Sequence, residues 1–372
     1  MQKLRPIQRL LLIGNSLVII ASLLSAYLPY LSPGSYWLSG FAGLLFPITS
    51  IIAACFIPIW IICKRWPLAT LSTIALLCCT KAIYVTFGLH PTPQNASRDQ
   101  EQQFTVMTFN TSNMGLRYYT HDSSRVTAIY NALQHAQPDI LCLQEFYTND
   151  KPELTDHLQR IVRSYGYNYH YFTCDRTHWD TWRYGIILFS KHPILNAISI
   201  PCGNNPNGSG SSFLQADLRI HQDTVRIFTA QLKSYMLNAN DYPGMAFGQQ
   251  HNTPAGSPRH LLAKMRNTFA TRARQAESLA SLAATSPYPF IICGDFNDTP
   301  VSYTYFTISN GLQDAFLHHG QGLGRTLSYL SPTLRIDYIL AHQQFNIHGF
   351  STFRNALLEH YPIMASFSLK KE

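Results

Sequence analysis

Two polar side chains follow an apolar run in the segment 291–300, which reads Ile-Ile-Cys-Gly-Asp-Phe-Asn-Asp-Thr-Pro. In an extended chain, residues two apart face the same side, so we expect Asp295 and Asn297 to project together while Phe296 turns back into the core. A carboxylate beside an amide that donates to a phosphate oxygen is a pair suited to phosphoryl chemistry. A Gly-Asp-x-Asn on its own is more simply explained as an Asx-rich turn, so the interpretation depends on further residues.

Polar groups also end or occupy other β-type runs, where a core strand has little use for them. These segments are Phe109-Asn110, Leu143-Gln144-Glu145 and Arg335-Ile336-Asp337-Tyr338-Ile339, and Glu359-His360-Tyr361-Pro362 stands just before the last apolar run.

The order of these motifs resembles the endonuclease/exonuclease/phosphatase superfamily, which includes deoxyribonuclease I, apurinic endonucleases and neutral sphingomyelinases. The matching motifs are Gln144-Glu145, Gly294–Asn297, Arg335–Tyr338 and His360-x-Pro362, and Ser190–Ile194 fits a common strand-end pattern of the family. The resemblance implies an α/β fold, a two-sheet α/β sandwich of four layers, with the site at the edge where strand ends converge.

The resemblance also implies a metal site. Glu145 would be the main Mg²⁺ ligand, helped by Asn110, with Glu359 as a further carboxylate and Mn²⁺ as the alternative ion. These are the hard oxygen ligands that Mg²⁺ prefers. The metal would polarise the phosphoryl oxygen and offset charge on the leaving group.

The catalytic roles that the resemblance implies fall on residues from several motifs. His360 would be the general acid/base, held in one tautomer by Asp337. Asp295 would orient the attacking water, and Asn297 and Gln231 would bind the phosphate.

Two departures from the family pattern bear on activity. Many members carry Asn-x-His-Leu where this chain reads Thr229-Ala-Gln-Leu232, and Ser-Asp-His where it reads Leu358-Glu-His360. Gln231 can donate a hydrogen bond but cannot deliver a proton. The alternative function is therefore a catalytically weakened binding or signalling protein that keeps the fold.

The part of the chain after residue 103 alternates strands and helices, which favours an α/β layered domain. We predict helices over Ser123–Ala136 and Pro258–Ala284. Strands are predicted over Phe104–Asn110, Asp139–Leu143, Tyr184–Phe189, Ser211–Leu218, Val225–Ala230, Phe290–Cys293, Ile336–Leu340 and Ile363–Leu369.

The first hundred residues differ in composition, because no Asp or Glu precedes Asp99. The apolar runs Leu10–Tyr30, Phe41–Ile62 and Leu68–Leu89 each have the roughly 20 residues that a membrane-spanning helix needs. They predict three transmembrane helices. Lys81 lies inside the third run, where snorkelling is a simpler explanation than a functional role.

The domain organisation follows: a membrane anchor over residues 1–90, a linker over 91–103 and a catalytic domain over 104–372. Lys3, Arg5 and Arg9 precede the first run, and Lys64 and Arg65 separate the second from the third. By the positive-inside rule these ends are cytoplasmic, so the catalytic domain is expected to be extracytoplasmic. The resemblance is to membrane-anchored bacterial members, which suggests the inner (cell) membrane.

The expected function is Mg²⁺-dependent hydrolysis of a phosphodiester or phosphomonoester by in-line attack of an activated water. The substrate stays open between nucleic acid and a phospholipid head group. The bilayer is an expected partner through the three spans, and the sequence implies no protein partner.

Composition limits these alternatives only in part. The net charge of +8 includes the membrane flanks and is therefore weak support for nucleic-acid binding. Arg117, Arg125, Arg176 and Arg183, near several aromatic residues, would suit a phosphate-tracking groove, a lipid surface or simply solvated loops. The soluble part has no C-x-x-C pair, which argues against structural zinc. Cys174 and Cys202 could pair in an oxidising compartment.

Overall fold

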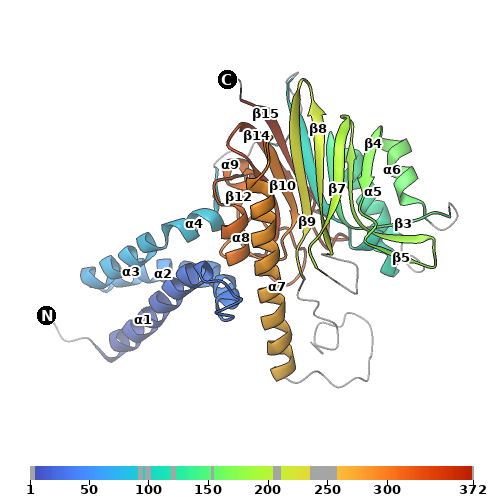
Figure 1. Ribbon diagram of the computed structural model, residues 1–372. Helices are drawn as coiled ribbons and strands as arrows, with labels where there is room; N and C mark the ends of the chain where they lie inside the picture. Colours follow the sequence, from blue (N-terminus) through green and yellow to red (C-terminus); the bar gives the residue numbers. More distant parts are fainter. Residues whose placement is uncertain are drawn as a thin grey trace.

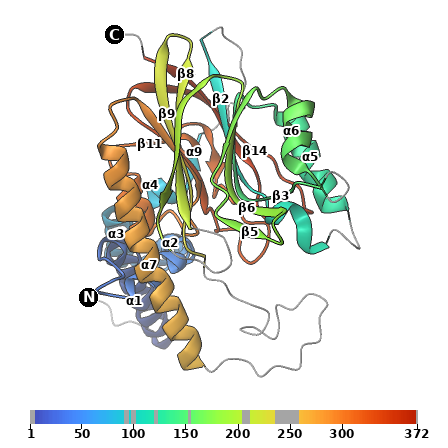
Figure 2. The same ribbon diagram turned by 45° about the vertical axis from the view of Figure 1, so that its right-hand side comes forward.

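The computed structural model of the chain describes residues 5–90, 95–96, 102–118, 123–151, 155–203, 211–234 and 258–370. Most of the predicted linker 91–103 lies outside these residues. Within them, two large sheets form the centre of the molecule, and helices lie on their outer faces (Figure 1, Figure 2).

One sheet has seven strands, six of them in the order β14-β15-β2-β3-β6-β4, and β5 adds to β6. In that order the strands are Phe345–Thr352, Ile363–Leu369, Phe104–Asn110, Ile140–Asn149, Trp182–Ser190 and Tyr169–Phe172, with β5 at Arg176–His178. Only β2 and β3 are parallel among these pairs.

The other sheet has six strands in the order β11-β13-β10-β9-β8-β7. They are Gln313–Asp314, Asp337–Ala341, Phe290–Asp295, Asp223–Gln231, Ser212–Ile220 and Ile194–Pro201. A small separate sheet pairs β1 (Gly88–Leu89) with β12 (Gln321–Gly322).

The two sheets enclose one apolar core between their inner faces, with Val106 and Cys142 from one sheet against Ala216 and Ile291 from the other. A second cluster lies between the seven-stranded sheet and the helices α5 (Ser124–Ala136) and α6 (His157–Tyr165). A third lies between the six-stranded sheet and the helices α7 (Pro258–Ala284) and α8 (Tyr303–Ile308). The layers therefore run helix, sheet, sheet, helix. A 3-10 segment, η2 (Asn113–Tyr118), and a short helix, α9 (Ala315–His319), complete the domain.

The predicted strands and both predicted helices are confirmed, most with slightly longer bounds. The prediction omitted β4, β5, β7 and β14 and the short helices α6, α8 and α9. In β7, for example, exposed and half-buried residues alternate irregularly along an edge strand, so the apolar period is weak. All described cysteines, Cys174 and Cys202 included, are free thiols.

The N-terminal part begins with two helices long and apolar enough to cross a membrane, Pro6–Tyr30 and Ser39–Ile62. The first comprises α1 (Pro6–Tyr27) and η1 (Leu28–Tyr30), and the second is α2 (Ser39–Ile62). The third predicted span is wrong as a single helix. Its residues form α3 (Trp66–Cys78) and α4 (Thr80–Thr86), which meet at an angle of 65°.

The bend between α3 and α4 follows from what α4 packs against. Ala82 and Val85 belong to the apolar cluster that contains Phe296 and Tyr305 of the folded domain. The ammonium of Lys81 lies 5.1 Å from the ring centroid of Tyr30 and 5.4 Å from that of Phe306. Lys81 therefore lies where the helices meet the domain and makes cation–π contacts there.

Close backbone contact joins α2 to the domain, in addition to these side-chain contacts. A Cβ added to Gly43 would lie 1.4 Å from the carbonyl oxygen of Val301. Phe41 packs edge-to-face on Phe269 of α7, with ring centroids 4.8 Å apart. The N-terminal helices are thus packed on the domain as well as connected to it in sequence.

Replacing Gly43 by Ala should therefore lower the melting temperature of the full chain, because the methyl group forces α2 away from Val301. Such overpacking costs about 1–3 kcal/mol, which corresponds to a few degrees. Tryptophan fluorescence during thermal unfolding in detergent would measure it. Gly14→Ala in α1 is the matched control, since its Cβ would meet only the Phe56 ring, at 3.7 Å. Equal melting temperatures for the two variants would show that the Gly43 contact is absent in solution.

Candidate active site

The ends of three neighbouring strands place the central polar residues in one row. Asp295, the last residue of β10, pairs in register with Gln231 of β9 on one side and with Asp337 of β13 on the other. Gly294 permits this approach, because a Cβ at its φ of +140° would lie 1.9 Å from the carbonyl oxygen of Ala230. The Gly in the Gly-Asp-x-Asn motif is thus required by the close contact of β9 and β10.

The seven-stranded sheet contributes its residues through an irregularity in β3. The pairing of β3 with β6 shifts between Leu143 and Phe146, and Glu145 has a φ of +46°. A bulge of this kind re-aims a side chain, and here it turns Glu145 toward Asn110 and Gln231. The amide of the buried Gln144 donates to Thr229 of the other sheet at 2.8 Å. This bond joins the two sheets next to the site.

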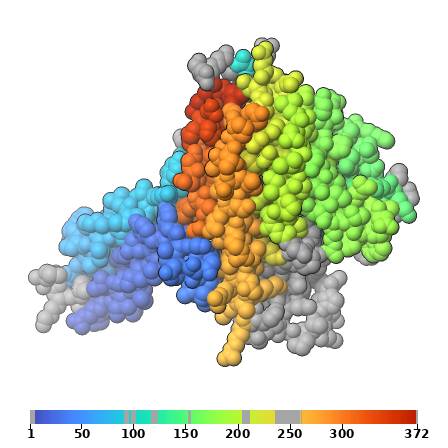
Figure 3. Space-filling view, in the orientation of Figure 1, coloured from blue at the N-terminus to red at the C-terminus, as the bar shows by residue number. Residues whose placement is uncertain are grey.

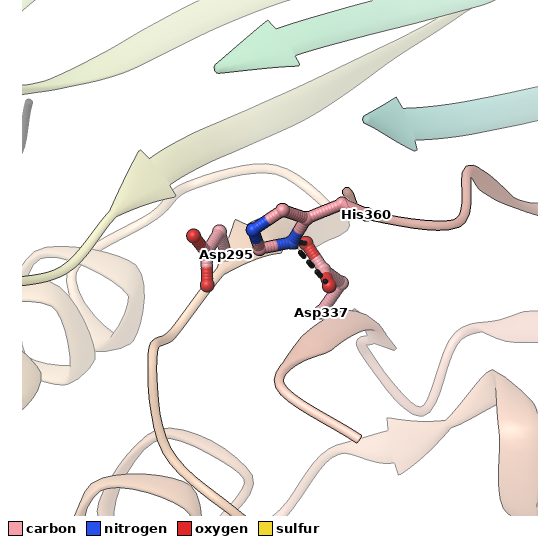
Figure 4. Close-up of side chains that lie close together, drawn as sticks. All are labelled: Asp295, Asp337 and His360. Carbon is pink, nitrogen blue, oxygen red and sulfur yellow. Dashed lines mark hydrogen bonds and ion pairs between the residues drawn. The ribbon is translucent and has the colours of Figure 1, made fainter. Parts of the chain in front are cut away.

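His360 and Asp337 form the contact expected of an oriented imidazole. The Nδ1 atom of His360 lies 3.0 and 3.3 Å from the two carboxylate oxygens of Asp337 (Figure 4). Thr326 connects the segments that carry these two residues. Its hydroxyl accepts from the backbone N–H of Asp337 at 3.1 Å, and its backbone carbonyl accepts from the backbone N–H of Tyr361. Both members of the pair are buried.

Asp295 faces the same imidazole and is held from several sides. Its carboxylate accepts from the side-chain amides of Asn110 and Asn297, at 3.0 and 2.9 Å, and from the backbone N–H of Asn297. Asn297 also donates to the carbonyl of Leu232 at 3.0 Å. Asn297 adopts a φ of +53°, a conformation that Asn tolerates better than most residues.

Burial sets the ionisation of these groups. Burial raises the pKa of Asp295 to about 7, and repulsion from Asp337 adds to the rise while His360 and Asn110 oppose it. Burial alone would lower the pKa of His360, but the carboxylates of Asp337, Asp295 and Glu145 outweigh it and raise the pKa to about 10. The imidazole therefore carries a proton at neutral pH and can donate it.

Glu145 is held by two amides. One of its oxygens, Oε1, accepts from Asn110 at 3.2 Å and from Gln231 at 2.5 Å. Beside it lies a cavity of about 170 Å³ lined by Asn110, Glu145, Arg125 and Glu359, among others. Glu359 lies at the rim of this cavity, 3.5 Å from the guanidinium of Arg125.

This donor set fits a small divalent cation. The second oxygen of Glu145 makes no hydrogen bond within the described part of the chain, and it belongs to a residue that lines the cavity. Asn110 points its amide nitrogen at Glu145 and Asp295, while its oxygen accepts from the N–H of Ser112 at 3.0 Å. In this arrangement Asn110 orients the carboxylates. Its predicted role as a ligand, and that of Glu359, stay predictions.

A second arrangement could also hold a metal ion. One ligand atom each from Asp295, Asp337 and His360 lie within 4.8 Å of one another. In Figure 4 the imidazole lies between the two carboxylates. The hydrogen bond between Nδ1 of His360 and the Asp337 carboxylate already uses two of these three residues. This bond favours proton transfer over metal coordination for Asp295, Asp337 and His360.

The structure thus brings together all the residues predicted from the sequence. Seven of them lie at one edge of the two sheets, and Glu359 lines the cavity beside Glu145. The seven are His360, Asp295, Asp337, Asn297, Gln231, Glu145 and Asn110. The sequence interpretation omitted Thr326, whose loop carries no motif, and the pairing of Arg125 with Glu359, which joins residues far apart in the chain. The side chains of Arg117 and Tyr118 lie outside the described residues.

Two family models match the chain. The model described as "Endonuclease/Exonuclease/phosphatase family" matches residues 107–359, which is more than half of the chain. It spans every predicted site residue except His360. A model described as "Domain of unknown function (DUF8431)" matches residues 8–86, the N-terminal helices. No curated protein matches the sequence.

Several solved structures are similar to the chain at low sequence identity. The human Nocturnin catalytic domain with bound sulfate anion is 17% identical over 76% of this chain and 100% of its own, with a TM-score of 0.51. An endonuclease/exonuclease/phosphatase from Beutenbergia cavernae is 17% identical over 73% of this chain and 72% of its own, with a TM-score of 0.49. D. rerio TDP2 complexed with single strand DNA product is 14% identical over 72% of this chain and 100% of its own, with a TM-score of 0.49.

Glu145→Gln should lower the affinity of the full chain for Mg²⁺ by at least about tenfold, because it removes the charge beside the cavity and disturbs its amide partners. Isothermal titration calorimetry in detergent would measure the affinity. Glu277→Gln is the matched control: Glu277 accepts from Tyr303 on the outer helices, at 2.7 Å, and a glutamine oxygen can still accept there. If Glu145→Gln binds Mg²⁺ normally, the ion is held elsewhere, for instance by Asp295, Asp337 and His360.

Proposed function

The chain belongs to the endonuclease/exonuclease/phosphatase family, and from this premise we propose that it hydrolyses a phosphate ester by attack of water at phosphorus. The observation that carries the proposal is the buried group Asp295, Asp337 and His360 beside Glu145. An acid and a base lie together there, and Asn110 connects them to Glu145, a carboxylate suited to a divalent ion that lines the cavity. A structural role alone gives no reason to bury so many ionisable groups together.

The ionisation of Asp295 and of His360 assigns each residue a different role in the reaction. Asp295, with its raised pKa of about 7, orients the attacking water and accepts its proton. His360, protonated and aligned by Asp337, donates a proton to the oxygen that leaves phosphorus. The new P–O bond forms on one side as the bond to the leaving oxygen breaks on the other. Each positioned acid or base typically contributes about 10²- to 10⁴-fold.

The amides supply the remaining contacts. Asn297 commits its side-chain N–H groups to Asp295 and to the backbone carbonyl of Leu232, so it holds Asp295 in place for the attacking water. Gln231 holds Glu145 at 2.5 Å, which gives the residue that replaces the family's second histidine a positioning role. Bound Mg²⁺, held by Glu145, would polarise the phosphoryl oxygen and offset negative charge on the leaving group.

The membrane setting is part of the proposal. Arg65, at the end of α2, donates to Gln8 at the start of α1 at 3.2 Å. Arg65 and the start of α1 therefore lie together at the end of the helices that points away from the folded domain, whereas Lys81 lies at the end that meets it (Figure 1). This arrangement supports a cytoplasmic N-terminus and an extracytoplasmic catalytic domain.

The full chain in detergent should hydrolyse bis-p-nitrophenyl phosphate in the presence of Mg²⁺ and stop when EDTA removes the ion. His360→Ala should lower kcat by about 10²- to 10⁴-fold, because it removes the proton donor. His170→Ala is the matched control, since His170 is an exposed histidine on the edge strand β4. A folded, Mg²⁺-binding chain that is inert toward this diester, monoesters, DNA and phospholipid would instead favour a binding or signalling role.

A further inference from the structure

Contacts of helix α7 show which part of the helix lies beside the candidate site. Where β9 ends, Gln275 accepts from the N–H of Lys233 at 2.8 Å, and Arg272 donates to the carbonyl of Lys233 at 2.9 Å. The guanidinium of Arg272 also lies 3.4 Å from Asp298, close in sequence to Asp295. The part of α7 around Arg272 and Gln275 therefore lies beside the strand ends that carry the site. At about 1.5 Å per residue, the turns of α7 before Arg272 project roughly 20 Å past it.

The N-terminal helices meet α7 at the same level. Phe41, near the start of α2, packs on Phe269, one turn before Arg272. Gly43 touches the carbonyl of Val301, and the few residues from Asp295 to Val301 can span at most about 20 Å. In the proposed topology this end of α2 lies at the extracytoplasmic face of the membrane. In this topology Asp295 therefore lies within about 20 Å of the bilayer surface.

The projecting turns of α7 suit a lipid surface. They lie beside the N-terminal helices, past the end of the sheets (Figure 1, Figure 3). Arg259 and Arg266 are exposed on them, and Leu262 between them is 45% exposed. A helix that carries arginines and leucine side by side at a membrane boundary binds the interface of anionic bilayers.

Apolar side chains at the outer ends of the spans continue this surface. Between α1 and α2, Leu31, Tyr36 and Leu38 are all exposed, the last two at 60%. Tyrosine and leucine at the end of a spanning helix lie well at the level of the head groups. Phe41 of α2 connects the two segments, because its ring contacts Trp37 of the loop and Phe269 of α7.

Most of the arginines near the site are paired with carboxylates within the described part of the chain. Among the described residues that line the cavity, Arg125 is the only cation, and it is paired with Glu359. Arg272 and Arg335 are buried against Asp298 and Asp314, and Arg183 lies 2.7 Å from Asp150. A nuclease needs unpaired cations to follow the phosphates of a strand.

Resting on the proposed phosphoesterase function, we infer that the substrate is the phosphate ester of a lipid head group in the chain's own bilayer. The projecting turns of α7 and the loop 31–38 lie on that bilayer and hold the active site against it. A head group then reaches the cavity beside Glu145 without leaving the membrane plane.

The test uses the full chain reconstituted in vesicles of phosphatidylcholine and phosphatidylglycerol. ³¹P NMR would measure the release of phosphorylated head groups, or the formation of phosphatidic acid where the head group leaves without its phosphate, next to turnover of soluble bis-p-nitrophenyl phosphate and of DNA. Arg259→Glu/Arg266→Glu should lower lipid hydrolysis about tenfold, because it repels α7 from the anionic surface. Its turnover of the soluble diester should not change, which also shows that it folds.

The control is Arg163→Glu/Arg219→Glu, the same charge change at exposed arginines of α6 and β8, and it should hydrolyse lipid at the normal rate. Turnover of the soluble diester and DNA without lipid hydrolysis would overturn the lipid inference and leave the phosphoesterase function standing. An equal loss in both double variants would overturn the role of α7. If the unmodified chain hydrolyses neither lipid, nor the soluble diester, nor DNA, both the phosphoesterase function and the lipid inference are overturned.

Discussion

The site depends on keeping two carboxylates buried side by side. Asp295 and Asp337 pair in register across adjacent strands and are almost wholly buried, an arrangement that is strongly unfavourable when both are charged and uncompensated. The protonated imidazole of His360 lies between them, and amides from Asn110 and Asn297 satisfy Asp295. Three features bring the charged imidazole of His360 next to the two carboxylates. They are the register of the strand ends, the close contact at Gly294 and the loop that contains Thr326. In the proposed mechanism, the proton that compensates the buried charge is also the one that His360 donates.

Much of this arrangement could be predicted from the sequence, for a physical reason. The candidate site residues at strand ends appear as polar residues in apolar runs, as in Gly294–Asn297 and Arg335–Tyr338, and such runs can be recognised from the local sequence pattern. The central strands are buried on both faces and carry a strong apolar signal. The strands and the site residues at their ends follow from these local features, whereas the two-sheet sandwich is implied by the resemblance to the family and not by periodicity.

The rest depends on contacts between distant segments, which local pattern does not encode. The bulge that turns Glu145 into the site arises from the pairing of β3 with β6. The ion pair of Arg125 with Glu359 joins α5 to the loop before β15. The apolar run Leu68–Leu89 has the composition of a straight span, yet its last two turns pack on the domain and the helix bends at Cys79. Composition predicts affinity for an apolar environment, and it does not say whether lipid or protein provides it.

The bend at Cys79 has a consequence for the catalytic centre. The buried guanidinium of Arg335 donates to Asp314 and to the backbone carbonyl of Val85 in α4, each at 2.6 Å. Arg335 stands two residues before Asp337, so the segment that aligns His360 is tied directly to the N-terminal helices. Without α4, a buried charged group would lose one of its acceptors, and such a loss is expensive in a low-dielectric interior. The N-terminal helices are therefore part of the support of the candidate site, since the contact between α4 and Arg335 also holds the segment that leads to Asp337.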